Sequence, residues 1–510
     1  MNSHRSLSAL SESSPLLRYI DKSEKDIGFG TTLKMICASS LPIFFVYFTT
    51  LARDNIALHF LKDYDDNRLL NAVGIGTTYI DVFAASMFIS LNIGLTSKTS
   101  KVFAVQNFRL VGIYSHKSLI INTFVLIPGC LLAYFSDKVC IAIGYDYQTS
   151  LYVQEYLSSC IFGLCAFMIF NTQVATLYAC QRFYVPALIE ILGAVFYWIL
   201  AYILIGRNGM TIKGVSICFN AMYAFTAVCI LLYQKLWDPV PGSFFWFTRR
   251  SFRGLWSHFK TVVLIGATVF LEWIADEIVY MFGGVLPVNE LTALTIANNN
   301  LFILESIPLS LMDTLLSYIG SAMGENNPKK AKRFLVGGLF ISTIGLIIIE
   351  AIFLTLPDYI TQFYTNDPST MALASKILRI TVLGYISDFS KNILMAGLTA
   401  IGKEKIASKI TLVFYYFFEI PISYCLCFFA KLDATGLALG QAITPYLILI
   451  SLLIVYSQLD WKQQASFVSE EIQREPNYYS FILDNNNELP GEKENGTQAS
   501  KNPKESSILG

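Results

Sequence analysis

Charged residues are scarce in this chain, and histidine is rarer still. Of its 510 residues, 15% are Asp, Glu, Lys or Arg, four are His, and 54% are hydrophobic. The formal net charge is zero, so no overall basic field favours a nucleic-acid partner. The sequence lacks a nucleotide-binding loop, a nucleophile elbow, a histidine cluster and a metal-binding cysteine spacing, so we expect neither an enzyme nor a cofactor. This composition is typical of an integral membrane protein.

A leader peptide is not apparent either. The first 30 residues are polar and have no apolar core, so we expect membrane insertion to depend on the first spanning helix. Residues 1–34 and 458–510 are expected to be disordered tails, because they are rich in Ser, Asn and charged residues. Residues 12–17 (ESSPLL) resemble an acidic dileucine sorting signal. A tail without a sorting function accounts for so short a match equally well. If the motif is used, it directs the protein to an endosomal or vacuolar membrane instead of the plasma membrane.

Long hydrophobic runs, in contrast, are abundant. A helix needs about 20 apolar residues to cross a bilayer. Runs of this length recur between short polar breaks, which predicts an all-α integral membrane protein with twelve transmembrane helices. The expected spans are 35–52, 71–97, 112–135, 151–178, 185–206, 213–234, 258–285, 291–321, 334–356, 370–400, 405–430 and 434–457.

Lys and Arg are concentrated in alternate loops. Segments 98–117, 235–253, 329–333 and 403–409 hold most of them, together with the N-terminal tail, whereas the opposite loops hold fewer. Positively charged loops remain on the cytoplasmic side of a membrane. With an even number of helices, this asymmetry predicts that both termini are cytoplasmic.

The chain also repeats itself at a fixed offset of 221 residues. This repeat predicts two six-helix halves related by a parallel pseudo-two-fold axis, with a substrate cavity between them. The expected units are an N-terminal lobe at 35–234, a cytoplasmic linker at 235–257 and a C-terminal lobe at 258–457. The matched pairs are Leu157 and Leu378, Gly163 and Gly384, Asn171 and Asn392, Leu177 and Leu398, Ala179 and Ala400, and Arg182 and Lys403.

Three carboxylates, Glu272, Asp276 and Glu277, lie in the expected helix at 258–285, and no basic residue follows Lys260 within it. A charged side chain at mid-membrane costs roughly 2.5–3.5 kcal/mol, and it usually faces a bundle interior or a water-filled cavity. Three acids without a local base favour a functional site over a polar contact between helices.

Helix geometry separates these acids into two directions. Glu272 and Asp276 are four residues apart and share a face, whereas Glu277 points about 140° away from Glu272. We expect Glu272 to face the cavity and Glu277 to reach a neighbouring helix. Burial favours the neutral form of a carboxyl group, so one such group can hold a proton or an organic cation, but not both. Trp273 can add a cation–π contact, although core packing is the commoner role of such a residue.

Short motifs lie at corresponding places in the two halves. In the predicted seventh helix, Glu272-Trp273 is followed by Glu277, and in the tenth, Asp388 lies upstream of Gly402. The other motifs are Gln106-Asn107, Gln173 to Pro186 with Leu177 and Gln181, Ile307-Pro308-Leu309, and Met323 to Pro328. Together they resemble the multidrug and toxin extrusion (MATE) family of cation-coupled antiporters, particularly its eukaryotic branch, over residues 35–457.

The resemblance implies a set of site residues. Lys391, nearly one turn after Asp388, departs from the family, in which a neutral polar residue is common, and an ion pair between the two is one option. Asn171 and Gln173 are equally compatible with a cavity and with bridging between helices. The expected coupling residues are Glu272, Glu277, Asp388, Asp276 and Glu305, and the expected cavity residues are Trp273, Gln173, Asn171 and Asn299, where the family's helix-eight acid would fall.

The predicted function is that of a secondary antiporter, monomeric in the lipid bilayer, which exports organic cations, drugs or other amphipathic small molecules in exchange for protons. Two alternatives stay open. Na⁺ can replace H⁺, because carboxylates bind either ion. A lipid-linked saccharide flippase of the related superfamily is the other, although its anionic cargo calls for a more basic cavity. Twelve helices in two repeats argue against a receptor, and no selectivity-filter repeat indicates a channel.

Overall fold

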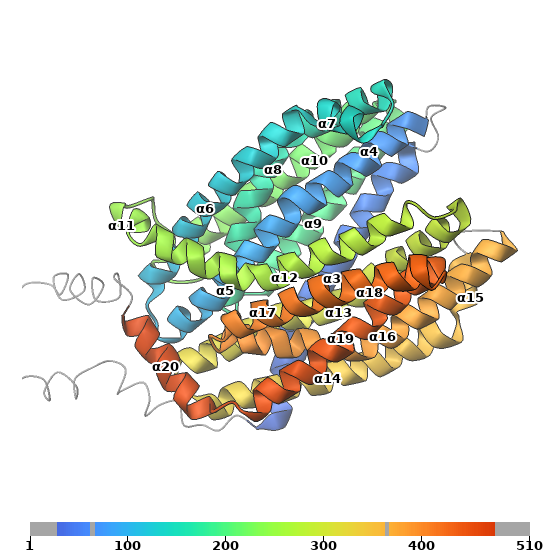
Figure 1. Cartoon of the computed structure of the whole chain (residues 1–510). Helices are drawn as coiled ribbons and strands as arrows, with labels where there is room; N and C mark the ends of the chain where they lie inside the picture. Colours follow the sequence, from blue (N-terminus) through green and yellow to red (C-terminus); the bar gives the residue numbers. More distant parts are fainter. Residues whose placement is uncertain (1–27, 62–66, 363–366, 475–510) are drawn as a thin grey trace, which may run out of the picture.

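The computed structural model describes residues 28–61, 67–362 and 367–474, which form helices joined by short turns (Figure 1). Four short π-helical segments interrupt the longer helices: η1 (Asp81–Ala85), η2 (Tyr202–Arg207), η3 (Tyr415–Glu419) and η4 (Cys425–Phe429). The α-helices are α3 (Phe29–Leu61), α4 (Asn67–Ile80), α5 (Ser86–Ala104), α6 (Phe108–Tyr134), α7 (Ser136–Ile143), α8 (Tyr147–Ala179), α9 (Tyr184–Ala201), α10 (Ile212–Trp237), α11 (Arg249–Phe252), α12 (Leu255–Gly283), α13 (Val288–Gly324), α14 (Pro328–Thr355), α15 (Pro357–Gln362), α16 (Pro368–Ala400), α17 (Glu404–Phe414), α18 (Ile420–Tyr424), α19 (Asp433–Ser457) and α20 (Trp461–Gln473).

All twelve predicted spans coincide with long helices, which confirms the all-α membrane fold. Within the described residues, nine are long and apolar enough to cross a membrane by length and composition alone. The other three are α12, α13 and α16, which carry buried acids and amides. Most helices extend beyond the predicted ends, because hydropathy marks only the apolar centre of a span and polar turns continue the helix at its ends.

The C-terminal tail corrects the prediction of disorder from residue 458. Residues 461–473 form α20, which begins at the N-cap Asp460 and buries Ala465, Val468 and Ile472. Apolar residues spaced by three and four positions form one helix face, but the polar composition of the segment concealed this pattern. The remaining tail residues and the motif at 12–17 lie outside the described residues.

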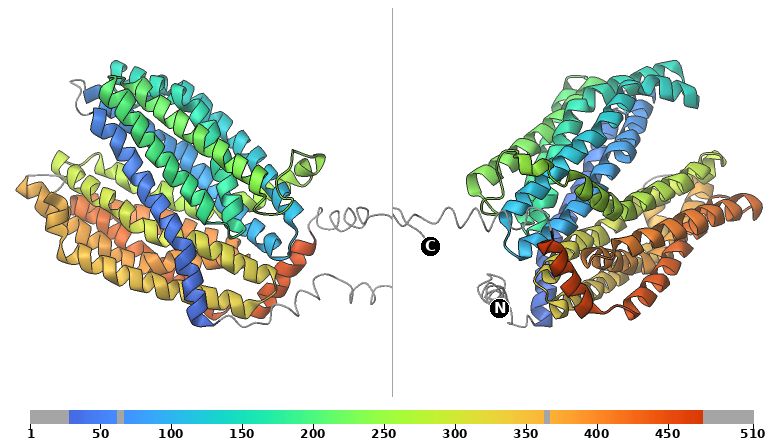
Figure 2. Two further views of the ribbon diagram at one scale, coloured as in Figure 1. Left: turned by 180° about the vertical axis from the view of Figure 1, so that it is seen from behind. Right: turned by 60° about the vertical axis from the view of Figure 1, so that its left-hand side comes forward.

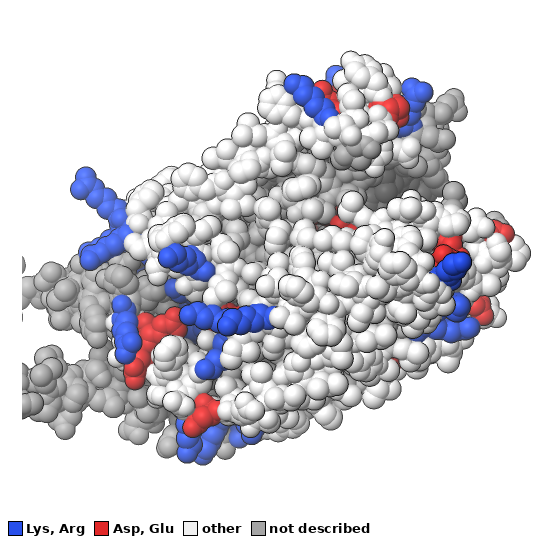
Figure 3. Space-filling view, in the orientation of Figure 1, with Lys and Arg blue, Asp and Glu red and all other residues white. Residues whose placement is uncertain are grey.

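Two helix bundles make up the molecule. The first, α4 to α10, lies above the second, α13 to α19, in Figure 1, and the two diverge away from the chain ends (Figures 1 and 2). Figure 3 shows the surface hollowed between the bundles at that end. Two helices connect the bundles: α3 packs against α9 in one and α13 in the other, and α12 packs against α5 and α17.

The backbone confirms the internal repeat. Two pairs of helices end in corresponding turns with positive φ, at Gln106 and Gln181 in the first half and at Asn326 and Gly402 in the second. The paired turns share one hydrogen-bond pattern, since the N–H of Arg182 donates to the Leu177 carbonyl at 2.9 Å and that of Lys403 to Leu398 at 3.0 Å. Such bonds satisfy carbonyls at a helix end. The sequence offset of 221 therefore corresponds to a structural repeat of six helices.

Candidate functional site

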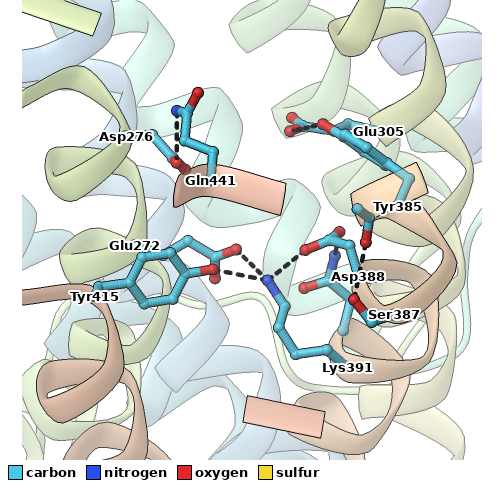
Figure 4. A network of polar contacts seen from close by, with 11 residues as sticks. Glu272, Asp276, Glu305, Tyr385, Ser387, Asp388, Lys391, Tyr415 and Gln441 are labelled. Atoms are coloured by element: carbon cyan, nitrogen blue, oxygen red, sulfur yellow. Dashed lines mark hydrogen bonds and ion pairs between the residues drawn. The ribbon is translucent and has the colours of Figure 1, made fainter. Parts of the chain in front are cut away.

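Lys391 lies at the centre of a buried ionic network in the second half (Figure 4). Its Nζ lies 2.5 Å from Glu272 Oε1 and 2.6 Å from Asp388 Oδ1. It also donates a hydrogen bond to the Tyr415 hydroxyl at 2.9 Å. Only 1% of the Lys391 side chain is exposed, compared with 20% for Glu272 and 13% for Asp388. Three acceptors satisfy all three donors of the ammonium, which explains how α16 can bury this charge.

Asp276, on the face of α12 that also carries Glu272, makes a further contact beside this centre. Gln441 Nε2 on α19 donates to Asp276 Oδ1 at 3.3 Å. Glu419 of η3 is 1% exposed, and its Oε1 has no hydrogen-bond partner among the described residues.

Glu305 forms a second neighbouring contact. The Tyr385 hydroxyl on α16 donates to Glu305 Oε1 on α13 at 2.7 Å. One turn further along α16, Asp388 accepts a hydrogen bond from Asn392 Nδ2 at 2.7 Å. Because Tyr385 and Asp388 are three residues apart on α16, this helix links Glu305 to the Lys391 centre.

The structure thus brings together four of the five predicted coupling residues: Glu272, Asp276, Glu305 and Asp388. Glu277 is half-buried on α12 and makes no hydrogen bond or ion pair with any residue that the structure describes. Its expected reach towards a neighbouring helix therefore involves no polar partner among the described residues. Its position follows from the helical step, which turns it away from the face of Glu272.

Two of the predicted cavity residues belong to a separate polar cluster in the first half. Asn171 Oδ1 accepts from Asn92 Nδ2 at 2.6 Å. Gln173 is 5% exposed, donates to Ser115 Oγ at 3.3 Å and accepts from Gln234 Nε2 at 3.0 Å. These amides join α8 to α5, α6 and α10, so Gln173 bridges helices in this structure.

The other two cavity candidates contribute less. Trp273 is half-buried on α12, next to Glu272. Asn299 belongs to α13, and its side chain lies outside the described part of the structure.

The network also contains four residues that were not predicted as site residues: Tyr385, Asn392, Tyr415 and Gln441. A weak sequence signal exists for each tyrosine, since Tyr385 precedes Asp388 by three residues and Tyr415 precedes Glu419 by four. These spacings place two side chains on one helix face. Gln441 is a lone amide in the apolar run of α19, which is equally typical of a helix contact.

Two carboxylates of the network hold one ammonium group. Glu272 and Asp388 are both paired with Lys391. Charge-assisted hydrogen bonds of this kind are stronger than neutral ones, and burial strengthens them further. The site can therefore bind an ammonium group in a low-dielectric interior.

Comparisons with known proteins agree with this architecture. The MatE family model matches residues 42–203 and 265–425, one segment in each half. Protein DETOXIFICATION 49 of Arabidopsis thaliana is 24% identical over 454 residues, covering 86% of this chain and 88% of that protein. Multidrug and toxin extrusion protein 1 of Xenopus tropicalis is 24% identical over 405 residues, covering 79% and 70%.

Solved structures show the same fold. The eukaryotic MATE transporter AtDTX14 superposes with a TM-score of 0.82 at 18% identity, covering 87% of this chain and 99% of that one. A MATE transporter of Vibrio cholerae, VcmN, superposes with a TM-score of 0.75 at 12% identity, covering 85% and 99%. Because the family model matches more than half of the 510 residues, this protein belongs to the MatE family of membrane transporters.

Proposed function

We propose that this protein is a secondary antiporter that exports organic cations or other amphipathic small molecules in exchange for protons. The observation that carries this proposal is the buried network around Lys391, in which Glu272 and Asp388 already bind an ammonium group. The names of the Xenopus and Arabidopsis relatives, which refer to multidrug and toxin extrusion and to detoxification, support an export role.

Exchange follows from competition at Glu272. This carboxylate is the most exposed member of the Lys391 centre, and it belongs to α12, whereas Lys391 and Asp388 both belong to α16. A cargo cation neutralises Glu272, and so does a proton. Because the two compete for one negative charge, release of cargo on one side of the membrane permits proton loading there, and release of the proton on the other permits cargo loading.

Asp276, Glu419 and Glu305 provide neighbouring proton positions. Asp276 follows Glu272 by one turn of α12 and accepts a hydrogen bond from Gln441, while Tyr385 donates one to Glu305. A proton that leaves Glu272 therefore has carboxyl groups nearby to receive it. We propose that these groups keep the site close to neutral while cargo enters or leaves.

Alternating access requires the two halves to move relative to each other. We propose that the lobes at 35–234 and 258–457 rock about α3 and α12, which each pack against both bundles. The hollow between the bundles lies away from the chain ends (Figures 1 and 3). With both termini cytoplasmic, as the distribution of Lys and Arg predicts, this conformation opens to the outside.

Transport in proteoliposomes tests the proposal. Uptake of tetraethylammonium is measured with an imposed pH gradient, for the wild type beside Glu272→Gln. We expect gradient-driven uptake by the wild type and its loss in the variant. The matched control is Gln173→Asn, which alters an amide of the first half without changing its charge and should retain uptake. A wild type that moves cations with a Na⁺ gradient alone would overturn proton coupling, and uptake that survives in Glu272→Gln would overturn the role of Glu272.

A further inference from the structure

The internal repeat shows that the charges around Lys391 are not needed to build the helix that carries them. At the offset of 221 residues, Asp388 and Lys391 correspond to Phe167 and Phe170 of α8. Both phenylalanines are buried and belong to the apolar core of the first half. The same helix of the repeat therefore packs with aromatic residues in one half and with an ion pair in the other.

Lys391 behaves as a fixed cation within the site. Its ammonium is nearly inaccessible to solvent and contacts Glu272, Asp388 and Tyr415 at 2.5–2.9 Å. Asp388 is three residues away on the same helix, so this pair remains together when the helices move. Glu272 lies on α12, across the interface between two helices. A cargo cation that binds therefore replaces Lys391 as the ion-pair partner of Glu272, while the pair of Lys391 and Asp388 stays intact.

The charge balance then limits what the site accepts. Two ionised carboxylates and one ammonium leave the centre with a single net negative charge. A cargo with one positive charge neutralises it, whereas a cargo with two would leave an uncompensated positive charge in a buried site, which is strongly unfavourable. We propose that Lys391 restricts transport to singly charged organic cations, an inference that rests on the proposed function.

Binding of two probe cations tests this selectivity. Tetraethylammonium carries one positive charge and methyl viologen two, and the affinity of each is measured by calorimetry on purified full-length protein. In the wild type we expect tetraethylammonium to bind more tightly. In Lys391→Met the preference for methyl viologen relative to tetraethylammonium should rise by at least about tenfold, since the centre now carries two negative charges. Lys391→Arg keeps the charge and should keep the wild-type preference.

A charge-balanced pair of variants covers the case in which Lys391→Met fails to fold. Asp388→Asn leaves Glu272 and Lys391 with no net charge and should weaken tetraethylammonium binding. Asp388→Asn combined with Lys391→Met restores one negative charge and should restore that binding. Phe170→Met, at the corresponding position of the first half, is the matched control and should change neither affinity.

The outcomes separate the two proposals. An unchanged preference in a folded Lys391→Met protein, or a double variant that binds no better than Asp388→Asn, overturns the role of Lys391 while leaving cation exchange intact. A wild type that binds neither cation overturns the proposed function, and this inference with it.

Discussion

Amides fill the polar interior of the first half, whereas carboxylates and a lysine fill that of the second. Asn122 Nδ2 donates to Asn92 Oδ1 at 3.1 Å and to Thr172 Oγ1 at 2.9 Å, and these neutral bonds join three helices. The corresponding region of the second half joins its helices through Glu272 and Lys391. Neutral and ionic groups can therefore satisfy the same requirement, which is to pair every buried polar atom.

The comparison distinguishes structural features that both halves share from charged groups that only the second half has at this place. Turns and helix caps recur in both halves, for example at Asp146 and Asp367, each of which caps a helix by accepting a hydrogen bond from a backbone N–H three residues later. The cluster of carboxylates around a buried lysine does not recur at the corresponding place, where Phe167 and Phe170 lie, although Lys101 and Lys117 are buried elsewhere in the first half. Since a neutral version of the helix folds in the first half, the more costly ionic version of the second points to function and not to packing.

The largest effect is expected from making the second half resemble the first. Replacing Asp388 alone by phenylalanine copies Phe167 and leaves Glu272 and Lys391 with no net charge. We expect cation exchange to fall by roughly a hundredfold, because loss of a charged partner from a buried pair costs about 2–5 kcal/mol of binding. Proteoliposome uptake measures the loss, and the unfolding temperature reports on folding. Full exchange by Asp388→Phe would show that this carboxylate is dispensable.

Two glycines at equivalent positions should respond unequally to alanine. A Cβ at Gly384 would lie 2.7 Å from Ala442 Cα, a backbone atom, whereas one at Gly163 would lie 2.5 Å from Asn220 Oδ1 and 2.6 Å from Phe219 Cδ1, both in side chains. Side chains can move aside more readily than backbone. Overpacking costs about 1–3 kcal/mol, and we expect Gly384→Ala to be near the upper end and Gly163→Ala near the lower. Thermal unfolding in detergent compares them, and an equal loss would contradict this difference.

A smaller difference is expected at the paired turns. Gly402 has φ of 82°, and its counterpart Gln181 has φ of 59°. A side chain in this region costs roughly 1–2 kcal/mol. Gly402→Ala should therefore lower the unfolding temperature, and Gln181→Gly should leave it unchanged or raise it. Stabilisation by Gly402→Ala would show that the two turns are not equivalent.

The smallest effect concerns the helix cap at Asp367. Hydrogen bonds from Ser369, Thr370 Oγ1 and the Thr370 N–H lower the pKa of Asp367 from 3.8 to about 2. The folded protein thus holds this group ionised, so its contribution to stability is present above about pH 4 and is lost as the pH falls towards 2. Hydrogen bonds from Thr149 also lower the pKa of Asp146.

Substitution by asparagine removes this titration while keeping a capping side chain. We expect the unfolding temperature of Asp367→Asn to fall less steeply than that of the wild type between pH 4 and pH 2. Asp146→Asn is the matched variant in the first half. A wild-type slope in Asp367→Asn would show that the cap does not contribute to acid sensitivity.

Much of the fold could be predicted from the sequence, because hydrophobic runs and a fixed repeat determine spans and connectivity. The acids Glu272, Asp276 and Asp388 could also be found, since a charge within an apolar run is conspicuous. Their partners could not, because Tyr415 and Gln441 belong to helices distant in sequence, and aromatic or amide residues occur in any membrane helix. The family motif in which a second Glu follows the Glu-Trp pair predicts Glu277 as a coupling residue, although its direction on α12 separates it from Glu272.

Competition between cargo and protons tests the central claim most directly. The affinity of purified protein for tetraethylammonium is measured as the pH is lowered. Competition at Glu272 predicts that the wild type and Gln173→Asn bind tetraethylammonium less tightly as the proton concentration rises, and that Glu272→Gln shows no such dependence. A wild-type affinity that does not change with pH, or an equal change in Glu272→Gln, would contradict exchange at this site.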